Sequence, residues 1–258
     1  MEITLAGKTA LVTGGSKGIG LAIATRFAAS GASVAILARG REALAQAEKS
    51  LAAQARGHIV AVAADVSNAD DVARAYDEVA RALGRIDIVV NNAGASATAP
   101  FESITDQAWQ QDFDLKLFAA IRLTRLAWPQ MKARRWGRII NVLNIGAKAP
   151  RAGSAPTSVT RAAGLALTKV LAGEGAPHGV LVNALLVGFI ESDQWVRAAE
   201  KAGTTLEAYL QERGKTVPLG RAGKAEEFAN IACFLASDAG AYITGTAINV
   251  DGGASPVV

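Results

Sequence analysis

Short apolar runs alternate along this chain with longer segments whose apolar residues recur at helical spacing. The runs lie at residues 10–12, 33–38, 58–64, 86–90, 138–143, 180–186 and 247–250, and the helical segments at 19–27, 42–55, 68–83, 106–134, 158–171 and 224–237. An uninterrupted apolar run indicates a strand buried on both faces, and strands that alternate with helices pair in parallel. The pattern predicts an α/β fold, a doubly wound, seven-stranded parallel sheet with helices on both faces.

Two segments depart from this alternation. The helical segment 106–134 contains Pro129. Because proline lacks an N–H group, we expect the helix to be interrupted near that residue. Residues 188–218 are polar and irregular apart from a helical stretch from Leu206 to Arg213, and we interpret them as a mobile segment that covers the substrate. No repeat or linker divides the chain, so we expect a single domain over residues 1–258.

The composition indicates one large core and argues against two classes of partner. Half of the 258 residues are hydrophobic, 19% are charged, and the formal net charge is +4. The one dense basic cluster flanks an apolar run, which favours a solvated helix end over a nucleic-acid site; it consists of Lys132, Arg134, Arg135 and Arg138. The single cysteine, Cys233, is expected in the core, and the N-terminal residues resemble no signal peptide. We therefore expect a cytoplasmic protein with no membrane span and no metal site.

A glycine-rich turn follows the first apolar run. Gly14, Gly15, Gly18 and Gly20 separate residues 10–12 from the first helical segment. A backbone that passes directly from strand to helix presents N–H groups and the positive end of a dipole, and glycines let a pyrophosphate approach closely. The turn predicts a dinucleotide site, with a plain strand-to-helix connection as the alternative.

Motifs along nearly the whole chain resemble those of the short-chain dehydrogenase/reductase family. They are Thr13-Gly14-x-x-x-Gly18-Ile19-Gly20, Asp65-Val66, Asn91-Asn92-Ala93-Gly94, Leu219-Gly220-Arg221-Ala222 with Glu226-Glu227, Phe234-Leu235-Ala236-Ser237-Asp238, and Gly245-x-x-x-x-Val250-Asp251-Gly252-Gly253. Because they occur in the family's order and spacing, the chain is identified as a divergent member of it. The resemblance implies a Rossmann-like fold that binds a nicotinamide dinucleotide.

Most of the cofactor residues that the resemblance implies lie at the carboxyl ends of strands, where such sheets form their ligand crevice. For Asp65 the alternative is an exposed acid at a strand end. The predicted cofactor residues are Gly14, Ser16, Lys17, Gly18, Ile19, Gly20, Arg39, Asp65, Val66, Asn91, Ala93, Gly94, Arg161, Gly188, Ile190 and Ser192.

The end of the second strand predicts which dinucleotide is bound. An acid there would accept hydrogen bonds from both ribose hydroxyls and would repel a 2′-phosphate. This chain has Ala38 at that position, followed by Arg39. Arg39 and Lys17 could pair with a dianionic phosphate, so we predict NADP(H) over NAD(H). The alternative is that both are ordinary surface cations.

The resemblance breaks at the catalytic positions. Active family members use an Asn, a Ser, a Tyr and a Lys, of which the Tyr is the general acid and base. The aligned residues here are Lys116, Asn144, Thr157 and Arg161, and no tyrosine lies near Thr157. Asn144 could still donate a hydrogen bond to a carbonyl, and Arg161 could hold a ribose or an anion. An aliphatic hydroxyl ionises far above neutrality, so Thr157 cannot replace the tyrosine as an acid.

A lysine is the remaining candidate for the acid. Crowding by Arg161 and Arg151 could lower the pKa of Lys116 or Lys148. If Lys116, Lys148, Arg151 and Arg161 all project into one crevice, their charge would attract an anionic ligand such as a carboxylate or an acyl thioester. The alternative is that Lys148 and Arg151 point to solvent. Trp195 is a further substrate candidate that could instead pack within the covering segment.

Three functional hypotheses follow from these residues. The first is an NADP(H)-dependent oxidoreductase that acts on a small carbonyl compound or alcohol with a non-standard proton donor. The second is a lyase, hydrolase or isomerase on the same fold, and the third is a nucleotide-binding sensor. The helices around residues 119–126 and 165–171 resemble those through which the family pairs, so we expect a homotetramer or homodimer.

Overall fold

The computed structural model describes residues 3–258, and it contains the seven parallel strands that the apolar runs predict. The strand order is β3-β2-β1-β4-β5-β6-β7. The predicted bounds are right to within about two residues; the strands are β1 (Thr9–Thr13), β2 (Ser33–Ala38), β3 (Ile59–Ala63), β4 (Ile88–Asn91), β5 (Gly137–Asn144), β6 (Val180–Val187) and β7 (Ala247–Val250).

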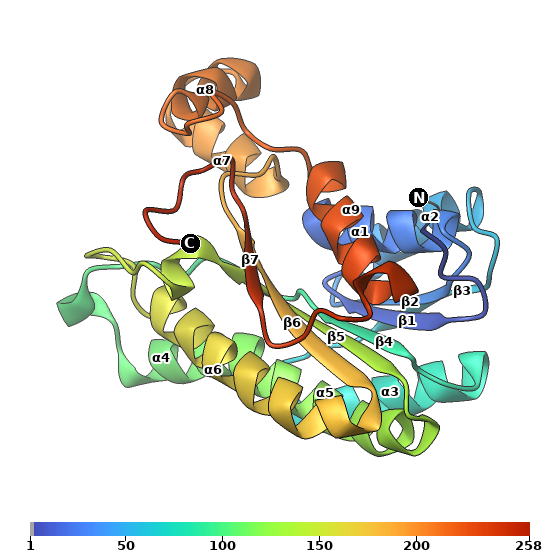
Figure 1. Ribbon diagram of the computed structural model, residues 1–258. Coiled ribbons are helices and arrows are strands. Elements are labelled where there is room, and N and C mark those ends of the chain that lie inside the picture. Colours follow the sequence, from blue (N-terminus) through green and yellow to red (C-terminus); the bar gives the residue numbers. More distant parts are fainter. Residues whose placement is uncertain (1–2) are drawn as a thin grey trace.

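Helices cover both faces of the sheet, as predicted (Figure 1). One layer contains α1 (Gly18–Ala29), α2 (Arg41–Ala52) and α9 (Ala225–Ala236), and the other contains α3 (Ala69–Leu83), α4 (Asp106–Phe113), α5 (Ala119–Arg134) and α6 (Thr157–Gly175). Leu11 and Val12 are neighbours on β1, both are fully buried, and they belong to different core clusters. A central strand therefore needs apolar residues at consecutive positions, because both of its faces are buried.

The chain reverses its direction across the sheet between β1 and β4. From β1 it builds outward to β2 and β3, and then it crosses back to β4 on the other side of β1. In open parallel sheets, ligands bind beyond the carboxyl ends of the strands at such a switch point. The glycine-rich turn after β1 and the Asn91–Gly94 segment after β4 border this point.

The long helical segment 106–134 is irregular, but not where the sequence predicts. The interruption expected near Pro129 is wrong, because α5 continues through that residue to Arg134. The irregularity lies at Asp114–Phe118, where the backbone forms a π-helix between α4 and α5. A π-turn widens a helix by one residue and is frequent at functional sites. Lys116 lies within this turn.

The segment 188–218 is more ordered than predicted. It contains α7 (Asp193–Lys201) as well as α8 (Leu206–Gly214), so the expectation of an irregular stretch before Leu206 is wrong. Both helices lie beyond the carboxyl end of β6 (Figure 1). They are joined by an aromatic cluster, in which Trp195 packs edge-on against Phe189 and stacks on Tyr209.

Two further expectations have different outcomes. Cys233 is fully buried in the core, as predicted. The basic cluster is not simply a solvated helix end, because Arg138 is only 4% exposed and lies over the ring of Trp136. In the part of the chain that the structure describes, no helix is both long and apolar enough to cross a bilayer.

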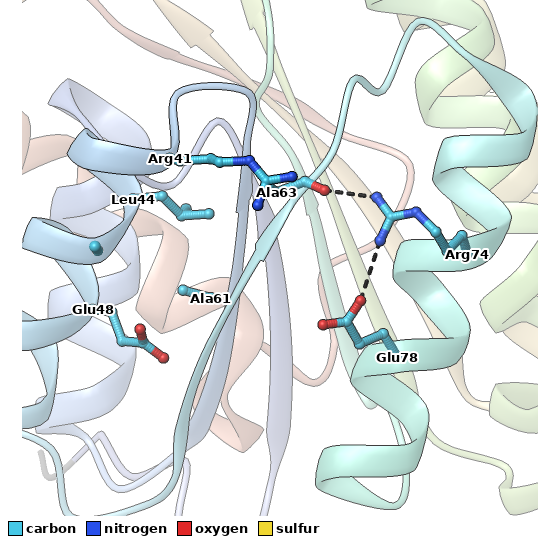
Figure 2. A pocket seen from close by; sticks show the side chains of 8 residues that line it. Arg41, Leu44, Glu48, Ala61, Ala63, Arg74 and Glu78 are labelled. Carbon is cyan, nitrogen blue, oxygen red and sulfur yellow. Dashed lines mark hydrogen bonds and ion pairs between the residues drawn. The ribbon is translucent and has the colours of Figure 1, made fainter.

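A cavity lies at the free edge of the sheet, beside β3, where α2 and α3 flank it (Figure 2). Arg74 donates from Nη2 to the carbonyl oxygen of Ala63 at 2.7 Å and pairs with Glu78 at 3.2 Å. Arg74 therefore donates a hydrogen bond to a backbone carbonyl at the edge of the sheet, on the side of β3 that faces no other strand. Arg41 lines the same cavity, which lies apart from the crevice between β1 and β4.

Candidate active site

The turn between β1 and α1 has a backbone that favours glycine at several positions. Gly14 and Gly18 have positive φ angles of 66° and 52°. A Cβ on Gly20 would lie 2.2 Å from the carbonyl oxygen of Gly14, well inside van der Waals contact. Ser16 and Ile19 lie in this turn and the first turn of α1. The glycines therefore keep the amino end of α1 open to a ligand, as the sequence predicts.

Side chains from β1 and from the segment after β4 hold this turn in place. Thr13 Oγ1 accepts hydrogen bonds from the N–H groups of Asn92 and Ala93, both at 3.0 Å. The amide of Asn92 donates to the carbonyl oxygen of Thr13 at 2.9 Å. Sequence reasoning assigned no role to Asn92. The side chain of the predicted cofactor residue Asn91 is turned inward, where it donates to Asn141 on β5 at 2.8 Å.

The predicted adenosine end of the site lies at the ends of β2 and β3. Arg39 is 75% exposed at its side chain, and its Nη1 is 3.9 Å from a carboxylate oxygen of Asp65. Asp65 accepts two hydrogen bonds from Ser67, at 3.0 Å from its N–H and 2.7 Å from its hydroxyl. Val66 is buried beside it. The loop after β3 is thus internally bonded, and Arg39 stays near it with its guanidinium in solvent.

The residues around the amino end of α1 fit a dinucleotide. The first turn of α1 carries no acidic side chain, and Lys17 stands at its N-cap. The hydroxyl of Ser192 is buried without a partner among the described residues, and a Cβ on Gly18 would lie 4.0 Å from the Cβ of Ser192. A buried polar atom without a partner indicates a site that a ligand completes. Gly188 and Ile190 lead to Ser192 from β6, and a Cβ on Gly188 would overlap Asp251.

Two of the four substituted catalytic positions, Lys116 and Thr157, are in direct contact. Lys116 Nζ donates to Thr157 Oγ1 at 2.9 Å and forms a short ion pair with Asp112 Oδ1. Thr160 also donates to Asp112, at Oδ2 and 2.7 Å. The ion pair is buried, with the Lys116 side chain 1% exposed and that of Asp112 2% exposed.

Sequence reasoning missed Asp112 and Thr160. Asp112 stands four residues before Lys116, a spacing at which a helix brings acid and base together. That spacing was a usable signal. No comparable signal pointed to Thr160, because it lies on another helix, α6, and reaches Asp112 across 48 positions of sequence.

Burial and the carboxylate of Asp112 act in opposite directions on the pKa of Lys116. Burial lowers the pKa of its amine, the hydrogen bond and charge of Asp112 raise it, and the charge of Arg161 lowers it; the net pKa is below the ordinary value. The predicted lowering of the Lys116 pKa is therefore supported, although burial and not crowding by cations is the main cause.

The side chain of Arg161 lies beside Gly94, in the segment that follows β4. Its Nη1 donates to the carbonyl oxygen of Val142 at 2.8 Å, while a Cβ on Gly94 would lie 2.5 Å from its Nη2. Burial lowers the pKa of the guanidinium to about 10. Arg161 Nε and the Oδ1 of Asn144 are both buried without a partner among the described residues. Both atoms mark polar sites that a bound molecule could complete.

Three residues are predicted to contact the substrate, and the structure shows what surrounds each of them. Lys148 donates to the carbonyl oxygen of Ala247 at 2.8 Å and to Asn249 Oδ1 at 3.0 Å, so its amine is held against β7. Arg151 is exposed in the loop after β5. Trp195 donates from its ring nitrogen to the carbonyl oxygen of Ile190 at 2.7 Å and packs edge-on against Phe189.

These positions change the electrostatics that the sequence predicts. Asp112 neutralises Lys116, and Lys148 faces β7. A crevice lined by four converging cations is therefore wrong. Among the side chains that the structure describes, no group of three or more from His, Cys, Asp or Glu is placed to bind a metal ion.

Comparisons with known proteins agree with this architecture. A family model described as enoyl-(acyl carrier protein) reductase matches residues 14–255. A short-chain type dehydrogenase/reductase from Mycobacterium ulcerans has 33% identity and a TM-score of 0.89, and the match covers 98% of this chain and 91% of the other. This chain belongs to the short-chain dehydrogenase/reductase family.

Two further members of this family are similar over the full length. The 3-oxoacyl-[acyl-carrier-protein] reductase of Aquifex aeolicus is 34% identical, with 98% of this chain and 99% of that protein covered. L-Sorbose reductase from Gluconobacter frateurii, solved with NADPH and L-sorbose, is 35% identical with a TM-score of 0.96, and both chains are fully covered. The family and the Rossmann-like, single-domain fold predicted from the motifs are thus confirmed.

Proposed function

We propose that this protein is an NADP(H)-dependent oxidoreductase that interconverts a small carbonyl compound and the corresponding alcohol. The observation that carries the proposal is the intact glycine turn with its open amino end of α1, and across from Gly18 the hydroxyl of Ser192, which has no partner among the side chains that the structure describes. Similarity to oxidoreductases, one of them solved with NADPH, supports the same reaction class.

The chain's own residues would divide the work as follows. The turn at residues 14–20 would hold the pyrophosphate, and Arg39 and Lys17 the 2′-phosphate. NADPH, when bound, supplies a hydride to the carbonyl carbon. Asn144 stands at the position of the family's Ser, and the N–H groups of its amide could donate to the carbonyl oxygen.

A charge on the substrate is not part of this proposal. The hypothesis of an anionic substrate depended on four cations in one crevice, and the carboxylate of Asp112 neutralises one of them, Lys116. We infer that neutral carbonyl compounds are accepted as well as anionic ones. A screen of matched pairs, each a carboxylate and its amide or ester, measures this directly.

The proposal is tested in two stages. Binding of NADPH is followed by fluorescence and by thermal shift, and turnover is then followed by the loss of NADPH absorbance over a panel of aldehydes and ketones. Binding with turnover is the expected result. Binding without turnover over the whole panel would favour the nucleotide-binding sensor, a function consistent with the missing tyrosine. Absence of binding would refute the proposal.

Cofactor choice is tested at Arg39. Arg39→Ala removes a cation proposed to pair with the 2′-phosphate, so the Kd for NADPH should rise about tenfold or more, and the Kd for NADH should stay within about twofold. Arg41→Ala is the matched control, because Arg41 lies two residues on but lines the cavity beside β3 (Figure 2). Equal loss of NADPH and NADH affinity in Arg39→Ala would contradict the assignment.

A further inference from the structure

Reduction of a carbonyl requires a proton at oxygen as well as a hydride at carbon. The chain has no tyrosine at the position of the family's general acid, where Thr157 stands instead. An isolated threonine hydroxyl is a poor acid. In the structure, however, Thr157 Oγ1 lies 2.9 Å from the amine of Lys116 and within one hydrogen-bonded network.

The hydrogen bonds of Thr157 leave its proton available. Its Oγ1 accepts from Lys116 Nζ at 2.9 Å and from the N–H of Ala97 at 3.0 Å. A hydroxyl has two lone pairs and one O–H. Because both lone pairs of Thr157 Oγ1 accept hydrogen bonds, a further hydrogen bond of this hydroxyl can only be one that its O–H donates.

Lys116 is a suitable source of a replacement proton. It carries three N–H groups, of which one points to Asp112 and one to Thr157. A hydroxyl that loses one proton while it receives another from an ammonium group never carries a full negative charge. The high pKa that disqualifies an isolated threonine therefore does not apply to this pair.

We propose that Lys116 and Thr157 form a proton relay that replaces the missing phenol, and that Asp112 is the positioning residue that orients Lys116. The proposal rests on the proposed oxidoreductase function. In the reductive direction, the new C–H bond at the carbonyl carbon takes the two electrons of the C–H bond that breaks in the nicotinamide ring of NADPH, and the carbonyl π pair moves to oxygen. That oxygen takes the proton of Thr157 Oγ1, and Thr157 takes a proton from Lys116 Nζ. The neutral amine keeps its contact with Asp112 and takes up a proton from solvent after the product has left.

The charged groups around Lys116 set the pH range of this relay. Asp112 faces it from α4 and Arg161 from α6. Burial and Arg161 lower the pKa of the amine below its ordinary value, whereas Asp112 opposes them. Removal of the carboxylate charge in Asp112→Asn should lower it further, so this variant should lose reductase activity at a lower pH than the wild type.

Substitutions at both relay positions test the proposal by activity. Thr157→Val and Lys116→Met should each lower kcat about 100-fold, and Thr157→Ser should retain kcat to within about fivefold. Because the two residues act as a unit, the double variant should be no more than about threefold slower than the worse single variant. Ser158→Ala, at the adjacent and equally buried hydroxyl, should stay near the wild-type rate. Undiminished turnover in Thr157→Val, or fully multiplicative losses in the double variant, would overturn the relay.

A second readout does not depend on turnover. In cofactor-free protein labelled with 13Cε-lysine, the resonance of Lys116 is assigned by its loss in Lys116→Met and titrated with pH. We expect a pKa below 10.5 that falls further in Asp112→Asn and shifts in Thr157→Val. Thr157→Val keeps the ion pair and so provides the shift if Asp112→Asn does not fold. An ordinary lysine pKa that neither variant changes would overturn the inference, whereas failure of NADPH binding would instead refute the proposed function.

Discussion

At the scale of single residues, the electrostatic character of this site depends on which partners its charged side chains contact, and not on the number of charged residues. Lys116 looks like an added cation in the sequence, yet Asp112 lies against it and cancels its charge. Lys148 is likewise used by β7 through the carbonyl oxygen of Ala247 and Asn249 Oδ1. A charged side chain placed by alignment therefore says little about the local field until its partners are known.

The close packing of the glycine turn predicts that one added methyl group weakens both folding and NADPH binding. Gly20→Ala would place a methyl group 2.2 Å from the carbonyl oxygen of Gly14. Relief of such an overlap must move backbone, at a cost of about 1–3 kcal/mol, and the moved turn should bind NADPH at least tenfold more weakly. Urea unfolding and an NADPH titration measure the two effects.

Gly40 is the matched control for this substitution. A Cβ there would meet open space, and its φ of −80° suits any residue. Gly40→Ala at the N-cap of α2 should change the free energy of unfolding by less than about 1 kcal/mol. Equal effects of the two substitutions would contradict the role assigned to the turn.

At the scale of elements, irregular pieces of backbone decide where the site residues lie. The π-turn at Asp114–Phe118 joins α4 to α5 and presents Lys116 to α6.

The start of α9 is held in place by the side chain of Glu227. Glu227 accepts two hydrogen bonds from Arg221, at 2.8 and 2.7 Å, and one from the N–H of Lys224 at 2.8 Å.

The bonds at Glu227 predict a pH-dependent stability. They lower the pKa of Glu227 from 4.5 to about 2, with the Arg221 side-chain bond as the largest cause. Because the folded-state pKa is lowered, the stabilisation is complete above pH 4.5 and is lost as the pH falls from 4.5 to 2. Glu227→Gln should therefore be less stable than the wild type at pH 7, and the difference should shrink at pH 3.

Urea unfolding at pH 7, 5, 4 and 3 measures this difference. Glu226→Gln is the control, because Glu226 is exposed on the same turn of α9. Its stability should follow the wild type at every pH. A Glu227→Gln effect that is constant from pH 7 to pH 3 would show that the carboxylate charge does not matter.

At the scale of the whole molecule, α6 has two different faces. One face holds Thr157, Thr160 and Arg161 toward the site. The other carries a stripe of exposed apolar side chains, in which Val159 is 46% and Val170 is 57% exposed. The stripe also contains Ala162 and Ala166, one face of the helix over three turns. Such a stripe favours a partner helix, and so supports the prediction of a homodimer or homotetramer.

Val170→Glu tests this prediction. A carboxylate buried against an apolar helix costs several kcal/mol, so the dissociation constant of the assembly should rise on the order of 100-fold. Sedimentation velocity over a range of concentrations measures it. Val196→Glu, on the exposed side of α7, should leave the assembly intact. A wild-type protein that sediments as a monomer at all concentrations would refute the pairing.

The sequence by itself determined the seven strands, the glycine turn and the family. The strands were readable because a run buried on both faces is apolar at every position, and Val34 to Leu37 on β2 are all fully buried. The turn was readable because the positive φ angles at Gly14 and Gly18 favour glycine. Such features are local, so a short window of residues contains the whole physical cause.

Only the tertiary structure decided what the substituted site contains. Thr157 meets Lys116 across 41 positions of sequence, and Lys148 meets Asn249 across 101. The helix at Asp193–Lys201 was missed because its polar residues hid the short apolar side that packs on Phe189. In each case the partner lies on a distant segment, and no periodicity in the chain reports which segments meet. The energy of a buried charge or hydroxyl is set by those partners, and so it exists only in the folded molecule.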